Sequence, residues 1–175
     1  MNTKRGFLYA LFGVVLVVVV FTRLYFPNDE TGGSFGPQGP LPAFGQEGWI
    51  NGPGPTPAEL EGHVVVIDLW AFWCGPCKKA VPDLIKLQKS FESQGVVFLG
   101  ATNEGGENLD KSQAFVKETS IPWPNAYGTE KLFDELSIEG IPTILVVARD
   151  GQIVWRGHNA RRAEEAIVKA LALKN

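Results

Sequence analysis

The chain holds two cysteines, Cys74 and Cys77, and both lie in the segment Trp73-Cys74-Gly75-Pro76-Cys77. Two thiols separated by two residues at the start of a helix can interconvert between dithiol and disulfide without a rearrangement of the fold. A purely structural disulfide explains the spacing poorly, because so short a loop removes little entropy from the unfolded chain. The spacing therefore favours thiol-disulfide exchange.

The expected helix gives the two thiols different roles. Cys74 would lie at the helix N-terminus, where unpaired backbone N–H groups and the positive end of the helix dipole stabilise a thiolate. We therefore expect Cys74 to be the exposed nucleophile. Cys77, one turn further in, would be the shielded thiol that attacks the mixed disulfide and releases the reduced substrate. Gly75 would let a partner approach, and Pro76 lacks an N–H that the first turn cannot use.

A single acidic residue, Asp68, interrupts the apolar run from Val64 to Leu69, six residues before Cys74. A run that is apolar on both faces is typical of a central strand covered by helices. Burial without a charged partner should raise the pKa of this carboxyl toward neutrality, so that Asp68 could accept the proton of Cys77. A structural aspartate bonded to a nearby backbone group or water is the alternative.

Metal binding is the main alternative use of a Cys-x-x-Cys pair. A structural zinc site usually has four Cys or His ligands, and the only candidates to join the cysteines, His63 and His158, are not spaced as partners. Copper(I) could instead be held by the two thiolates with a third ligand such as His158, although such sites usually separate the cysteines more widely. We expect no metal, and no cofactor other than the redox-active pair itself.

The pattern of the remaining elements predicts an α/β fold. The apolar run, the helix near the cysteines and a strand at 96–99 follow one another, which implies a parallel crossover. Asp150-Gly151 between two apolar runs indicates a hairpin. We expect a mixed central sheet with helices on both faces. Its other elements are an edge strand near 49–51, a short capped helix from Thr56 to Gly62, helices at 109–118, 130–136 and 162–173, and strands at 143–148 and 152–156.

An apolar segment near the N-terminus is typical of a membrane helix. Residues 7–21 are all apolar or Gly, and about 20 residues suffice to cross a bilayer core of about 30 Å. Lys4 and Arg5 precede the segment while Asp29 and Glu30 follow it, so the positive-inside rule keeps the N-terminus cytoplasmic. We expect residues 1–26 to anchor the protein in a membrane and the rest to lie outside the cytoplasm.

The rest of the chain divides by composition into a linker and a domain. Between Pro27 and Pro55, 14 of 29 residues are Gly or Pro, a composition that buries little and is typical of a tether. We assign residues 27–47 to this linker and residues 48–175 to the domain. Beyond residue 26 the sequence holds 13 Lys and Arg against 19 Asp and Glu, and this net charge of −6 disfavours binding to nucleic acid.

Three features of the sequence occur together. They are Pro82, five residues beyond Cys77, the segment Gly140-Ile141-Pro142-Thr143 before a strand, and the segment Ile67-Asp68-Leu69-Trp70-Ala71-Phe72-Trp73-Cys74-Gly75-Pro76-Cys77-Lys78-Lys79. Together they resemble the thioredoxin superfamily, and more narrowly its membrane-tethered TlpA/ResA-like thiol-disulfide oxidoreductases. The likeness runs from about Trp49 to Leu173. It implies a thioredoxin fold, and it favours the proton-transfer role for Asp68.

The resemblance also implies how a substrate would bind. Pro142 would be the cis-proline that lies against the active-site disulfide in this superfamily. Because proline lacks a donor, the backbone of Ile141 would be left free to pair with an extended substrate segment. Trp73 would face the substrate, and Trp70 would belong to the core.

The function implied by the resemblance is a membrane-anchored oxidoreductase that reduces protein disulfides on the outer face of a bacterial inner membrane. A membrane thiol carrier would re-reduce it. Oxidation of substrates is the alternative direction, because the direction depends on a small difference in reduction potential. One departure concerns position 80, where ResA-like relatives often have a glutamate and this chain has Ala80. This departure weakens any inference of the same specificity for apocytochrome.

We predict that the N-terminal anchor is uncleaved. A basic start and an apolar core also occur in cleaved signal peptides, but residues 22–27 offer no small-x-small cleavage site, and the apolar segment is longer than most signal-peptide cores. N-terminal sequencing of the protein extracted from membranes should therefore give a sequence that begins before Phe26. A mature N-terminus beyond Phe26 would identify the segment as a signal peptide.

Overall fold

A six-stranded sheet lies at the centre of the fold in the computed structural model, which describes residue 33 and residues 35–173. The strand order is β1-β4-β3-β2-β5-β6. Strands β2, β3 and β4 are parallel, and β1, β5 and β6 each run antiparallel to the neighbours with which they pair. The strands are β1 (Gly48–Ile50), β2 (Val65–Leu69), β3 (Val97–Thr102), β4 (Asn125–Tyr127), β5 (Thr143–Val147) and β6 (Ile153–Gly157).

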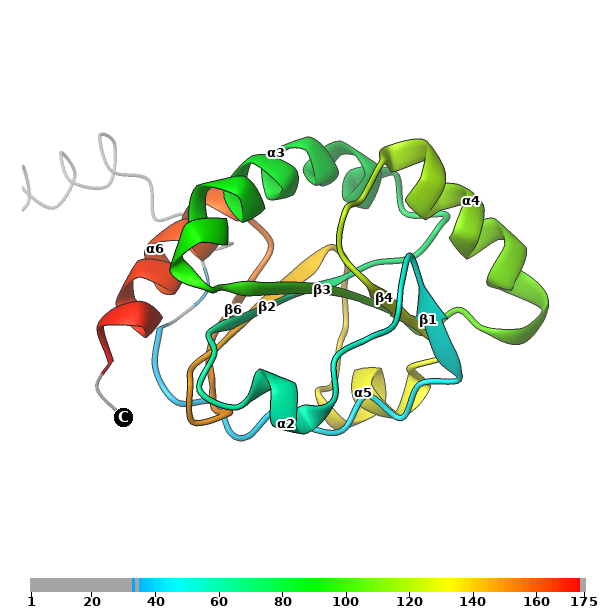
Figure 1. The fold of residues 1–175 in the computed structure, drawn as a ribbon. Helices are drawn as coiled ribbons and strands as arrows, with labels where there is room; N and C mark the ends of the chain where they lie inside the picture. Colours follow the sequence, from blue (N-terminus) through cyan, green and yellow to red (C-terminus); the bar gives the residue numbers. More distant parts are fainter. Residues whose placement is uncertain (1–32, 34, 174–175) are drawn as a thin grey trace, which may run out of the picture. The chain divides into compact units, whose positions relative to one another are not determined.

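Helices cover both faces of this sheet (Figure 1). One face carries the three long helices, α3 (Gly75–Phe91), α4 (Leu109–Thr119) and α6 (Ala160–Ala172). The other carries the short helices α2 (Pro57–Leu60) and α5 (Glu130–Glu135). Two 3₁₀ turns, Glu92–Gln94 and Gly106–Asn108, follow α3 and precede α4. The predicted mixed α/β sheet with helices on both faces is therefore confirmed.

Strand β2 is the central strand, and its side chains alternate between two apolar clusters. Val66 and Trp70 belong to the cluster that holds both cysteines and the buried side of α3. Ile67 and Leu69 belong to the cluster on the opposite face. Because side chains two residues apart point to the same side of a strand, Asp68 lies on the face of Val66 and Trp70. The pleat thus places the single carboxylate of β2 on the cysteine side of the sheet.

A buried polar link joins β2 to β4. The indole N–H of Trp70 donates to Asn125 Oδ1 at 2.9 Å, and Asn125 Nδ2 donates to the Trp123 carbonyl at 2.7 Å. The Trp70 ring also stacks on Phe115 of α4, with centroids 4.5 Å apart. Strand β4 has no counterpart in our reading of the sequence. It is only three residues long and follows Pro124, so its strand character depends on pairing with β3 and β1.

Part of the segment that we assigned to the linker packs along β6. The Gly36 N–H donates to the Val154 carbonyl at 2.7 Å, and the Ile153 N–H donates to the Gly39 carbonyl at 2.8 Å. The Phe35 ring packs against the α3-side cluster, and Lys169 Nζ lies 5.3 Å from its centroid. Composition could not indicate this, because the contact depends on the backbone groups of an edge strand rather than on an apolar pattern.

The predicted membrane anchor at residues 1–26 lies outside the described residues. Among the helices that the structure describes, none has both the length and the apolar character needed to cross a bilayer.

We predict that Gly100→Ala destabilises the protein by about 1–3 kcal/mol, because a methyl group there overpacks the core. The added carbon would overlap Asn125 Oδ1 and lie 2.9 Å from Trp70 Nε1, inside the buried link. Gly140→Ala is the matched control, since nothing lies within 4 Å of its added carbon. Urea unfolding should give a lower midpoint for Gly100→Ala alone. Equal midpoints for the two variants would contradict the prediction that a methyl group inside the buried link between Trp70 and Asn125 destabilises the fold.

Candidate redox-active site

The site begins where β2 leads into α3. Cys74 is the N-cap of this helix, with extended backbone angles, and its Sγ accepts a hydrogen bond from the Cys77 N–H at 3.1 Å. Gly75 and Pro76 begin the first turn, to which Pro76 adds no unpaired N–H donor. The first helical hydrogen bond runs from the Lys78 N–H to the Cys74 carbonyl at 3.2 Å. The sulfur of Cys74 thus lies where helix donors stabilise negative charge.

The two cysteines form a disulfide, with Cα atoms 5.2 Å apart. Cys74 is 4% exposed and Cys77 is 2% exposed. The expectation that Cys74 is exposed is therefore wrong for the disulfide form. The physical reason is that Cys74, bonded to Cys77 and accepting a hydrogen bond from its N–H, is packed within the apolar cluster on the α3 side of the sheet. The two cysteines therefore differ in their position in the helix rather than in their exposure.

Asp68 is 4% exposed, and its Oδ1 has no hydrogen-bond partner among the described residues. Burial raises the pKa of the Asp68 carboxyl to about 7, because the charged form loses its hydration. This agrees with the predicted direction. Asp68 shares its face of the sheet with the cluster that contains Cys77. A carboxyl with a pKa near 7 is suited to exchange a proton at neutral pH.

Trp70 is completely buried, as we expected, whereas Trp73, the residue before Cys74, is 63% exposed. The Trp73 indole N–H donates to Glu104 Oε1 at 2.7 Å. The other oxygen of this carboxylate accepts from Asn108 Nδ2 at 2.9 Å. Glu104 therefore holds an exposed aromatic ring beside the cysteines. Our reading of the sequence missed it, because Glu104 lies 31 residues away in a polar loop and carries no motif of its own.

Ile141 and Pro142 reach the same end of the sheet through strand pairing. The antiparallel register of β2 and β5 places Leu69 opposite Thr143, so Pro142 lies beside the point where β2 continues toward Cys74. The Ile141-Pro142 peptide bond is cis, as the resemblance implies. The half-buried Ile141 side chain packs against the cluster that contains both cysteines. Among the described residues, no hydrogen bond is made by the Ile141 backbone N–H or C=O.

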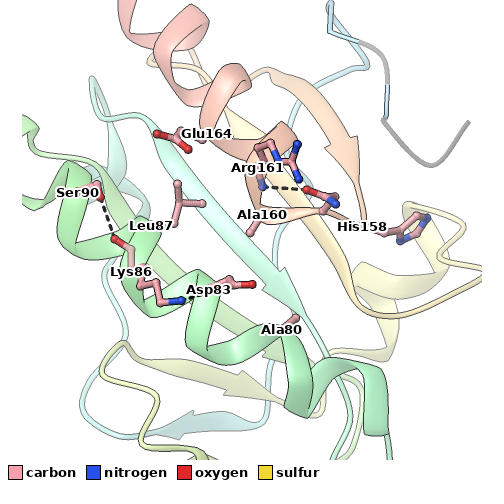
Figure 2. A pocket seen from close by; sticks show the side chains of 10 residues that line it. Ala80, Asp83, Lys86, Leu87, Ser90, His158, Ala160, Arg161 and Glu164 are labelled. Carbon is pink, nitrogen blue, oxygen red and sulfur yellow. Dashed lines mark hydrogen bonds and ion pairs between the residues drawn. The ribbon is translucent and has the colours of Figure 1, made fainter. Parts of the chain in front are cut away.

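A hollow of about 400 Å³ lies between α3 and α6 (Figure 2). Ala80 lines it one turn beyond Cys77, where the ResA-like pattern often has a glutamate. Further along α3, Lys86 Nζ forms an exposed ion pair with Asp83 Oδ1 at 2.9 Å. Arg161 and Glu164 of α6 line the same hollow. The walls therefore carry charges of both signs, and no single charge dominates.

In the part of the chain that the structure describes, no group of three or more His, Cys, Asp or Glu side chains could hold a metal ion. Both sulfurs are bonded to each other in this form. His158, the residue that we considered as a third copper ligand, has its Nδ1 2.6 Å from the Pro142 carbonyl oxygen.

Comparison with known proteins agrees with this geometry. The family model described as the AhpC/TSA family matches residues 42–156. The thiol-disulfide oxidoreductase ResA of Bacillus subtilis is 31% identical over 98 residues, which cover 55% of this chain and 54% of the relative. ResA of Bacillus cereus is 30% identical over 98 residues, or 55% of each protein. The chain thus spans about half the length of these curated relatives.

Solved structures are similar over most of the chain. The thioredoxin domain of a thiol-disulfide oxidoreductase from Bacteroides vulgatus matches with a TM-score of 0.68 at 20% identity, covering 79% of this chain and 99% of that domain. A thiol-disulfide isomerase from Corynebacterium glutamicum matches with a TM-score of 0.69 at 22% identity, covering 78% and 99% of the two chains. At these identities the likeness establishes the thioredoxin fold.

The fold, the disulfide at the start of α3 and the relatives that are thiol-disulfide oxidoreductases agree with one another and support a redox enzyme. The family match spans more than half of the sequence. The chain therefore belongs to the AhpC/TSA family of the thioredoxin superfamily, and it has ResA-like thiol-disulfide oxidoreductases among its relatives.

Proposed function

We propose that this protein is a membrane-tethered thiol-disulfide oxidoreductase that reduces protein disulfides outside the cytoplasm. The observation that carries the proposal is the Cys74–Cys77 disulfide at the N-terminus of α3, in a chain related to ResA. The basic residues before the apolar segment and the acidic residues after it support the orientation across the membrane. A membrane thiol carrier would supply the electrons.

Reduction of a substrate proceeds by two exchanges. The Cys74 thiolate attacks one sulfur of the substrate disulfide, which forms a mixed disulfide and releases the other substrate sulfur as a thiolate. Cys77 then loses its proton and attacks the Cys74 sulfur. This step forms the Cys74–Cys77 disulfide and releases the second substrate thiolate, so the dithiol has given two electrons to the substrate. A partner dithiol reverses both steps on the enzyme.

Asp68 takes the proton of Cys77 in the second exchange. The carboxylate is buried on the cysteine face of β2 and has no competing partner on its Oδ1 among the described residues. With a pKa of about 7, the group is partly ionised at neutral pH and accepts a proton without a large energetic barrier. Accepting it also returns the buried carboxyl to its neutral form, which burial favours.

The substrate lies against the end of the sheet where these groups meet. An extended segment pairs with the free backbone of Ile141, in the manner of an added strand, and passes Pro142. Gly75 has open space around its Cα, and Pro76 is exposed beside it, so the chain of a partner can approach Cys74 closely. Trp73 offers an exposed aromatic surface fixed by Glu104.

We predict that Cys74→Ser abolishes disulfide exchange, whereas Cys77→Ser traps substrates. The N-cap sulfur of Cys74 is the stabilised thiolate, and Cys77 is the neighbouring thiol that resolves the bond. Cells that express Cys77→Ser should accumulate covalent adducts on non-reducing gels, and these should vanish on reduction. The double variant is the control and should form none. Equal adducts in Cys74→Ser would reverse the two assignments.

We predict that Asp68→Asn removes a pH-dependent loss of stability. The folded pKa of about 7 exceeds the ordinary value of 3.8. The contribution of the Asp68 carboxyl to the free energy of unfolding is therefore fully present below pH 3.8 and is lost as the pH rises from there through 7. The difference between these two pKa values corresponds to at most about 4 kcal/mol of stability at alkaline pH. Urea unfolding should therefore show that the oxidised variant has a larger free energy of unfolding than the wild type, and that this difference is greater at pH 8 than at pH 4.5.

The same variant should slow the release of reduced substrate at pH 7 by about 10-fold or more, because the Cys77 proton loses its acceptor. Single-turnover reduction of insulin measures this step. Asp83→Asn is the matched control, since it removes an exposed carboxylate from α3 and leaves β2 untouched. If the Asp68→Asn variant gained stability at pH 8 but kept the wild-type rate, this result would contradict the part of Asp68 in proton transfer.

A further inference from the structure

Side chains outside the cysteine motif hold the backbone on both sides of Ile141. The Thr143 hydroxyl donates to the Gly140 carbonyl oxygen at 2.6 Å. The His158 Nδ1 lies 2.6 Å from the Pro142 carbonyl oxygen. The carbonyls before and after Ile141 are therefore both occupied, while the Ile141 N–H and C=O have no hydrogen bond among the described residues.

The bond to Pro142 fixes the tautomer of His158. A carbonyl oxygen only accepts, so Nδ1 carries the hydrogen and donates it. Nδ1 also lies 3.4 Å from the Thr143 hydroxyl oxygen, which itself donates to Gly140. His158 and Thr143 thus contact each other and together bind the carbonyls of Gly140 and Pro142. Neither residue belongs to the cysteine motif.

Strand pairing brings His158 to this place. In the antiparallel register of β5 and β6, Ile144 lies opposite Gly157, so the next residue along, His158, meets the segment that precedes β5. Figure 2 shows the His158 side chain directed away from the α3 side chains that line the first hollow. His158 also lines a second hollow of about 520 Å³, together with Glu139, Gly140 and Thr143. The ring therefore lies beside the segment 140–143, which contains the Ile141 backbone that we propose pairs with a substrate.

We propose that His158 is a positioning residue for substrate binding. By donating to the Pro142 carbonyl, it holds the segment 140–143 in the conformation that presents the Ile141 backbone to an extended, disulfide-containing polypeptide. This inference rests on the proposed function, because it assigns a residue to the substrate side of that site. His158 does not contact the sulfurs in this role. It sets how strongly a protein substrate binds, and leaves the exchange between thiols unchanged.

The test compares isosteric replacements in the full-length protein. The amide nitrogen of His158→Asn takes the place of Nδ1 and still donates, whereas His158→Asp places a carboxylate oxygen against the Pro142 carbonyl. We expect the KM for insulin to rise about 10-fold in His158→Asp with kcat nearly unchanged, the size expected for the loss of one hydrogen bond. His158→Asn should restore the wild-type KM. His158→Ala, which removes the donor without adding charge, should raise KM in the same direction.

A small aromatic disulfide, 5,5′-dithiobis(2-nitrobenzoate), serves as the second substrate, because it has no backbone to pair with Ile141. Because this disulfide carries two carboxylates, its rate is compared only in the variants without added charge. It should be the same in His158→Asn and His158→Ala as in the wild type, which also verifies that they fold. His63→Asp is the matched control for the change of charge. His63 is the other histidine of the chain, and its Nδ1 lies 3.0 Å from the Gly95 carbonyl oxygen, next to the opposite end of β2. This variant should keep the wild-type KM for insulin.

The outcomes separate the two proposals. An unchanged KM in both His158→Asp and His158→Ala, with insulin reduced normally by the wild type, would overturn the role of His158 alone. A KM raised equally in His158→Asn and His158→Asp would also overturn it, because the donor would then be irrelevant. A wild type that reduced the aromatic disulfide but not insulin would overturn the proposed protein-disulfide reductase, and this inference with it.

Discussion

The pairing of β2 with β5 is the interaction on which the whole site depends. Strand β2 carries Asp68 and leads directly into the helix that begins at Cys74. Strand β5 begins immediately after Pro142, and the register that sets Leu69 opposite Thr143 brings its start to the same end of the sheet. A shift of this register by one residue would turn every side chain of β5 to the other face. The backbone hydrogen bonds of the sheet centre therefore fix the thiols, the carboxyl and the Ile141 backbone relative to one another.

The electrostatics of the site work against the stability of the core. Every side chain of β2 is buried, and a carboxyl in such surroundings is stable mainly in its neutral form. The fold tolerates Asp68 because the surrounding apolar clusters are extensive on both faces of the sheet. Groups that violate the usual rules of burial are concentrated at functional sites. The energetic cost of Asp68 agrees with the proton-transfer role that we propose for it.

Two polar contacts from distant parts of the chain complete the surface around the cysteines. Glu104, after β3, fixes the exposed ring of Trp73 on one side. His158, after β6, fixes the carbonyl of Pro142 on the other. Both partners lie just beyond the ends of strands, where a side chain can reach across to a neighbouring loop. The centre of the sheet positions the cysteines and Asp68, and the loops after its strands supply the groups that contact Trp73 and Pro142.

The sequence by itself determined the chemistry and the local structure of this protein. The spacing of the cysteines, the capping residues and the apolar run around Asp68 predicted the fold class and nearly all the elements. They also predicted the direction of the Asp68 pKa shift. These predictions succeeded because helix capping, periodicity and desolvation depend on neighbouring residues. Only the tertiary structure decided four further features, which are the burial of Cys74 in the disulfide, the strand β4, the packing of residues 35–41 on β6, and the partners Glu104 and His158. Each of these depends on backbone groups or side chains that lie far apart in the chain and meet only when the sheet assembles. No local pattern encodes them, because a short polar loop or a glycine-rich segment has the same composition whether it is paired or free.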